Sequence, residues 1–195
     1  MSSGNAIEPI SHLKLLNNQH KKSNAGGNLT DQYYCFSYEN KKNTNYKGIF
    51  FCGLEVAEHF LKLTGKNPLP LFNPLKSILA NTSSNKKIDS ALERKQWNTT
   101  AKQLYNAIQF LLIVWETEPD YVLKIILGDL QKYYYQEPFP SKIKSVNTII
   151  GKDKNGQSLI EMIDSLKANG NDIKDFDFSL LIQKLKDENI EKINF

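Results

Sequence analysis

Cysteine and long hydrophobic runs are scarce in this sequence, and each shortage narrows what the chain can be. The 195 residues contain two cysteines, Cys35 and Cys52, which is typical of a reducing compartment and predicts a cytoplasmic location. The longest uninterrupted apolar run, Phe110 to Trp115, is far too short to cross a bilayer, so no membrane association is predicted. The first residues lack a basic start followed by an apolar core, and no secretion signal is therefore expected.

Arginine is almost absent, and the net charge is only +4. Residues 1–87 hold eleven lysines against five acidic residues, whereas residues 88–195 hold fourteen basic residues against sixteen acidic ones. Arg94 is the single arginine in the sequence. Because base recognition favours the guanidinium group, this composition argues against sequence-specific DNA reading. It leaves a basic N-terminal half that can contact nucleic acid without reading its sequence.

Aromatic residues are plentiful, and they organise the stretch 32–75. Two runs rich in Tyr, Phe and Ile flank the polar turn NKKNTN, a pattern that predicts a β-hairpin. A symmetric turn would pair Phe36 with Phe51 and Cys35 with Cys52, which places the two cysteines together on one face. The run after Gly53 changes to helical spacing up to Thr64, and three prolines then predict an extended arm.

Helical periodicity dominates the second half. Helices are predicted from Ser90 to Trp115, after Thr117 and Asp120, from Ser158 to Ala168, and after Asp177. Trp97 and Trp115 delimit the apolar stripe of the longest helix and are interpreted as core residues. Lys142 to Ile150 is expected to form a strand or an extended link.

The predicted fold class is α+β, with a small N-terminal antiparallel β-hairpin or sheet packed on a bundle of about five helices. Residues 1–28 are predicted to be a flexible segment, with a short helix possible from Ile10 to Asn18. Residues 29–195 are predicted to form one domain. Its hairpin and first helix span 29–75, and its helical part spans 88–195.

Cys52 is the one residue whose position suggests catalysis, because a helix N-terminus stabilises a nearby thiolate. A nucleophile also needs a base, and His59 lies two turns along the predicted helix, about 10 Å away along its axis. A structural cysteine is therefore favoured. A disulfide between Cys35 and Cys52 is disfavoured in a reducing compartment, and the ligands for a metal are lacking. No metal or cofactor is predicted.

A second motif, GKDKNGQS at residues 151–158, resembles the spacing of a phosphate-binding loop. Gln157 stands where that loop requires lysine, so the phosphate charge would lack its main partner. An ordinary turn is the preferred interpretation.

The predicted hairpin carries lysines with interleaved tyrosines, a combination that can track a nucleic-acid backbone and stack on bases. These candidate anion- or nucleic-acid-binding residues are Lys41, Lys42, Lys47, Tyr38 and Tyr46. Lysines at a hairpin tip are also ordinary protection against strand aggregation.

Other aromatic residues are candidates for protein contacts, since such residues dominate interface anchors. They are Phe72, Tyr133, Tyr134 and Tyr135. Because no set of nucleophile, base and charge stabiliser is found, the sequence favours a non-enzymatic cytoplasmic protein-interaction protein. The alternatives are a nucleic-acid-associated protein that uses the basic half, and a cysteine-dependent enzyme with Cys52 as nucleophile.

Overall fold

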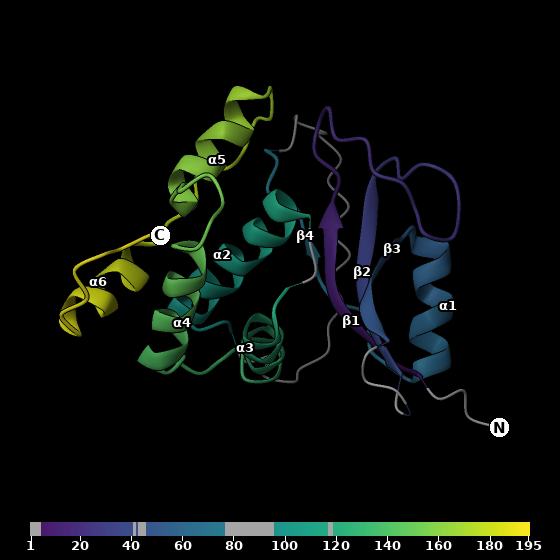
Figure 1. The fold of residues 1–195 in the computed structure, drawn as a ribbon, viewed down its shortest axis with the longest axis horizontal. Helices are drawn as coiled ribbons and strands as arrows, with labels where there is room; N and C mark the ends of the chain where they lie inside the picture. The colour runs from purple at the N-terminus through teal and green to yellow at the C-terminus, as the bar shows by residue number, and fades with distance from the viewer. Residues whose placement is uncertain (1–4, 41, 43–45, 77–95, 117–118) are drawn as a thin grey trace.

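The computed structural model describes residues 5–40, 42, 46–76, 96–116 and 119–195, which form four strands and six helices (Figure 1). The strands are β1 (Asn5–Lys14), β2 (Gln32–Asn40), β3 (Lys47–Cys52) and β4 (Leu71–Phe72). The helices are α1 (Leu54–Thr64), α2 (Thr99–Trp115), α3 (Tyr121–Lys132), α4 (Pro140–Ile150), α5 (Leu159–Ala168) and α6 (Ser179–Asp187). The predicted α+β class is confirmed. None of the described helices combines the length and hydropathy that a bilayer span requires.

The sheet has the strand order β3-β2-β1-β4, so the N-terminal strand lies inside it. β1 is antiparallel to β2. The two residues of β4 run parallel to the end of β1, where they pair with His12 and Leu13. This corrects the expectation of a flexible segment over residues 1–28 and of a helix from Ile10 to Asn18. A bulge between Pro9 and Ser11 breaks the strand alternation, so the buried Ile10 and Leu13 recur at a spacing that imitates a helix.

The predicted hairpin is present, but its register is one residue away from the symmetric pairing. Cys52 pairs with Tyr34, and Cys35 pairs with Phe51. Since neighbouring residues of a strand point to opposite faces, the slip puts the two cysteines on opposite sides of the sheet. Both are buried, and neither takes part in a disulfide. The side-by-side arrangement expected from the sequence is therefore wrong.

Helices cover both faces of the sheet, with α1 on one side and the other five helices on the opposite side (Figure 1). On the first side, Tyr34, Phe36 and Cys52 pack against Ala57 and Leu61 of α1. On the second side, the sheet meets α2, whose buried residues make up most of its length. The result is a three-layer arrangement in which the helix predicted over residues 54–64 forms one layer alone.

The core helix α2 begins later than the sequence suggested. Its N-cap is Asn98, whose side chain accepts a hydrogen bond from the backbone of Ala101. The predicted capping residues Ser90 and Glu93 lie outside the described residues. Trp97 precedes the helix, yet Trp97 and Trp115 both pack against the core as predicted.

The segment expected to be a strand or link is helix α4. Pro140 occupies its first turn, where a missing N–H does no harm, and Ile143, Val146 and Ile150 form its buried face. The β-branched residues of this segment favour a strand by composition, and burial against the bundle overrides that preference. For α3, Asp120 is the N-cap, and the predicted Thr117 falls outside the described residues.

Helix α5 starts at the capping box that the sequence predicted. The hydroxyl of Ser158 accepts a hydrogen bond from the backbone of Glu161, and the Glu161 carboxylate accepts one from the Ser158 backbone N–H at 2.7 Å. Hydrogen bonds from the Ser158 backbone N–H and the Ser158 hydroxyl to this carboxylate lower the pKa of Glu161 below its usual range. The cap thus satisfies two backbone donors that the first helical turn leaves unpaired.

Replacing Ser158 by alanine is expected to lower the free energy of unfolding by about 1 kcal/mol, because the first turn of α5 loses its acceptor. Urea denaturation followed by circular dichroism measures the change. Ser141→Ala, at an exposed position of α4, is the matched control and should shift stability by less than about 0.5 kcal/mol. Equal effects of the two substitutions would contradict the role of the cap.

Candidate functional site

Three adjoining cavities follow helix α3 and form a continuous surface depression, which we call the α3 groove. Their volumes are about 500, 310 and 500 Å³ from the start of α3 to its end. Glu8, Ser37 and Lys124 line both the first and the second cavity. Gly128 and Gln131 line both the second and the third. Shared walls therefore join the three cavities into one groove.

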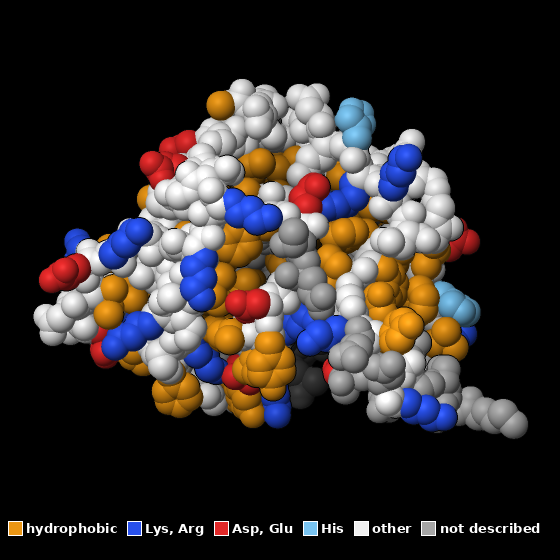
Figure 2. All heavy atoms as spheres, viewed as in Figure 1, with side chains coloured by type: hydrophobic (Ala, Val, Ile, Leu, Met, Phe, Trp, Pro, Cys, Tyr) orange, Lys and Arg blue, Asp and Glu red, His pale blue; other side chains and the backbone are white. Residues whose placement is uncertain are grey.

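The first cavity lies where α3 leaves part of the sheet uncovered. Its floor contains Ser37 and Glu39 of β2, and its wall is formed by Tyr121 and Lys124 of α3. Tyr121 is 77% exposed, which leaves its ring available to a ligand. Over the face that Figure 2 shows, hydrophobic and charged side chains lie next to one another.

The third cavity is aromatic and is bounded by the proline-containing arm after α1. The rings of Trp97 and Tyr134 lie 5.5 Å apart, centroid to centroid, and Pro68 and Pro70 form the opposite wall. Such an apolar cavity with aromatic walls suits a bulky side chain more than a charged group. The sequence predicted the arm. Its partner Trp97, however, lies 27 residues after Pro70, and their proximity could not be inferred from spacing.

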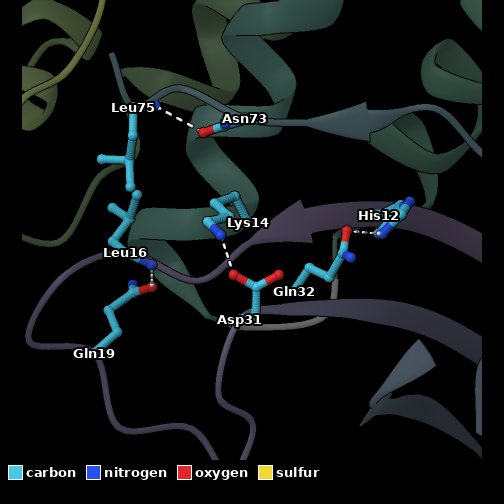
Figure 3. Close-up of polar contacts among 8 residues, drawn as sticks. All are labelled: His12, Lys14, Leu16, Gln19, Asp31, Gln32, Asn73 and Leu75. Carbon is cyan, nitrogen blue, oxygen red and sulfur yellow. Dashed lines mark hydrogen bonds and ion pairs between the residues drawn. The ribbon is translucent and has the colours of Figure 1, made fainter. Parts of the chain in front are cut away.

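Side chains of the sheet hold the arm in place. The backbone carbonyl of Leu69 accepts a hydrogen bond from the Tyr34 hydroxyl at 3.3 Å, and His12 Nδ1 lies 3.2 Å from the same oxygen. The His12 ring stacks on Tyr34, and its Nε2 lies 3.0 Å from Gln32 Oε1. Figure 3 shows the His12 and Gln32 side chains facing each other. The wall of the third cavity is thus fixed by polar contacts to β1 and β2.

Gly128 lies at the junction of the second and third cavities, on the exposed side of α3. A Cβ atom built on it would meet no other atom within 4 Å. Glycine is unfavourable inside a helix, so its presence here leaves open space at the cost of helix stability. This glycine inside a helical pattern is a sequence signal that was not used to find the groove.

The charged residues that line the groove are balanced in sign. The acidic ones are Glu8, Glu39 and Asp120, and the basic ones are Lys47, Lys124 and Lys132. Glu8 pairs with Lys66 of the arm at 2.7 Å, and Asp120 caps α3. The electrostatic potential along the groove therefore has no single sign, and the groove offers a polyanion no continuous row of basic side chains.

The candidate anion-binding residues do not form one cluster. Tyr38 and Lys47 line the first cavity of the α3 groove. Lys42 and Tyr46 are exposed near the hairpin tip, and Lys41 lies outside the described residues.

The candidate protein-contact residues are divided between core and surface. Phe72 is buried and makes an edge-to-face contact with Phe110 at 5.3 Å, so it belongs to the core. Tyr134 lines the third cavity, and Tyr135 meets it edge-on at 5.5 Å. Tyr133 is 40% exposed beside Lys132 at the end of α3.

Cys52 lacks the surroundings of a nucleophile. Its side chain is buried, and burial raises the pKa of the thiol to about 11. His12 lies in the same row of the sheet, with Tyr34 between the two, so about two strand spacings of 4.8 Å separate it from Cys52. His59 is exposed on α1 and contacts Phe60. Neither histidine is placed to take the thiol proton.

The glycine-rich segment at residues 151–158 follows helix α4, whereas a phosphate-binding loop follows a strand. Its backbone N–H groups at Asn155 and Gln157 donate to the carboxylate of Asp153. The same carboxylate accepts the indole N–H of Trp115 at 2.7 Å. The segment is therefore a turn held together by the carboxylate of Asp153. Among the described residues, no group of three His, Cys, Asp or Glu side chains is arranged to hold a metal ion.

The fold and the groove together define an α+β protein with an open, mixed-polarity surface groove. Residues 4–189 match the family described as uncharacterised conserved protein UCP028583, and the chain belongs to this family. No curated protein and no solved structure matches the chain.

Alkylation of Cys52 by iodoacetamide is expected to be slow at neutral pH in the folded protein. With a thiol pKa near 11, the rate should still be rising at pH 10, whereas the rate of an exposed thiol is half-maximal near about pH 8.5 and levels off about one pH unit higher. The measurement uses a Cys35→Ala background, so that Cys52 alone reacts, and urea-denatured protein as control. A rate that is already constant at pH 8 in the folded protein would show an activated thiolate instead.

Proposed function

We propose that this protein is a non-enzymatic, cytoplasmic protein-interaction protein that holds an extended segment of a partner polypeptide in the α3 groove. The observation that carries the proposal is the continuity of the three cavities along the whole of α3. A helix of 12 residues is about 18 Å long, which matches about five residues of extended chain.

The lining of the groove supports a polypeptide ligand. Apolar side chains such as Ile10, Ile125 and Trp97 can bury ligand side chains, and Gln131 offers an amide near the centre. Trp and Tyr are the residues that most often anchor protein interfaces, and the third cavity contains both. The groove lies open along the surface, a shape that suits a chain passing through it better than an enclosed small molecule.

The cytoplasmic location in this proposal is supported by the cysteines. Neither Cys35 nor Cys52 takes part in a disulfide, and they lie on opposite faces of the sheet, where they cannot bond to each other. Unpaired cysteines are typical of a reducing compartment.

Replacing Gly128 by tryptophan is expected to weaken peptide binding, because the new side chain fills the junction of the second and third cavities. The probe is a peptide selected from a random 12-residue phage library panned on the unmodified protein, with affinity measured by fluorescence anisotropy. We expect binding to Gly128→Trp to be weaker by at least about tenfold, a loss of about 1.4 kcal/mol.

Gly128→Ala is the matched control. A single methyl group leaves most of the groove open, so affinity should stay within about threefold, while helix stability rises by about 0.5–1 kcal/mol. Unchanged binding to Gly128→Trp would show that the groove is not the site. If single-stranded DNA bound instead, with affinity falling steeply as salt rises, the nucleic-acid alternative would replace this proposal.

A further inference from the structure

β3 is the outer strand of the sheet, and part of its hydrogen-bonding edge is open. The N–H of Phe51 donates to the side chain of Asn24 at 2.7 Å, and the carbonyl of Phe51 accepts from the backbone of Asn24 at 2.8 Å. Both backbone groups of Phe51 therefore point away from β2. By the alternation of an antiparallel strand, those of Ile49 and Lys47 also point outward. Among the described residues, these four groups have no hydrogen-bond partner.

Asn24 lies in a turn and already bonds both backbone groups of Phe51, through its own N–H and its side-chain oxygen, and its loop is firmly held. Lys21, three residues earlier, is 7% exposed, and its ammonium lies 4.1 Å from the centre of the Phe51 ring. The same ammonium lies 3.2 Å from a carboxylate oxygen of Glu116 at the end of α2. This turn closes the edge at Phe51, so a strand added to β3 must begin beside Ile49.

A cavity of about 390 Å³ lies beside the open edge, on the face that α1 covers. Phe50, Val56 and Phe60 line it, and the two phenylalanine rings lie 5.1 Å apart, centroid to centroid. Tyr38 also lines it and lies across Gly48, where a Cβ atom would come within 2.9 Å of the Tyr38 hydroxyl. A strand added to β3 would place alternate side chains over this apolar surface.

We infer that the edge of β3 binds an extended segment of a partner polypeptide as a fifth strand of the sheet. The added strand pairs with the backbone of Lys47 and Ile49, next to Asn24, and inserts an apolar side chain beside Phe50 and Phe60. Unpaired backbone donors and acceptors specify an extended polypeptide, and the cavity selects its side chain. Tyr38 and Lys47 also line the first cavity of the α3 groove, but the open edge of β3 is a separate feature, and the inference does not rest on the function proposed for that groove.

The test uses full-length protein with Gly128→Trp, which blocks the junction of the second and third cavities of the α3 groove, as the target for a random 12-residue peptide library on phage. Ile49→Pro, added to this protein, removes one outward N–H that the sheet does not use, and proline is tolerated on such an edge. We expect it to weaken binding of a selected peptide at least about tenfold. Ile49→Val keeps the N–H and should bind within about twofold.

Hydrogen exchange on the protein without an Ile49 substitution gives a second readout that does not depend on the proline variant folding. Bound peptide should slow exchange of the Ile49 and Lys47 amides, as strand pairing requires. Failure to select any peptide, equal affinity of Ile49→Pro, or unprotected amides in the complex would each overturn the inference. A dimer that sediments as such and dissociates on Ile49→Pro would assign the edge to a second copy of the chain instead.

Discussion

The packing of α2 against the sheet is the contact on which the rest of the structure depends. Most of α2 is buried, including Gln109 in the middle of the helix. The Oε1 atom of Gln109 accepts a hydrogen bond from Ser11, the residue that follows the β1 bulge. A buried polar pair is costly when mismatched, so this bond fixes how far α2 slides along β1. The positions of the other bundle helices follow from that alignment.

One consequence is that the helices leave part of the sheet uncovered. α3 crosses beside the first residues of β1 and the last residues of β2. The groove forms where the side chains of α3 separate from the sheet. The arm after α1 closes the far end, held through the carbonyl of Leu69 by Tyr34 and His12. The groove is therefore built from three segments that are distant in sequence, and the arm gives it a fixed boundary.

The elements that sequence predicted correctly are those with strong local signals. The capping box at Ser158 and the helical stripe before Gly65 mark their helices directly. The errors arise where local preference loses to long-range packing. β1 was missed because a bulge disguises its alternation, and α4 was missed because its β-branched residues favour a strand. Of the groove, sequence analysis found Tyr38, Lys47 and Tyr134, but it could not bring them to one helix, because their proximity depends on how the bundle meets the sheet.

The register of the hairpin has a consequence for cysteine oxidation while a newly synthesised chain is folding. The native pairing holds the two sulfurs apart across the thickness of the sheet, whereas a hairpin slipped by one residue would bring Cys35 directly beside Cys52. An oxidant that reached the chain before the hairpin settled would join them and preserve the wrong pairing covalently. A thiol reductant such as glutathione would reverse such an error, so correct pairing of the hairpin is favoured under reducing conditions.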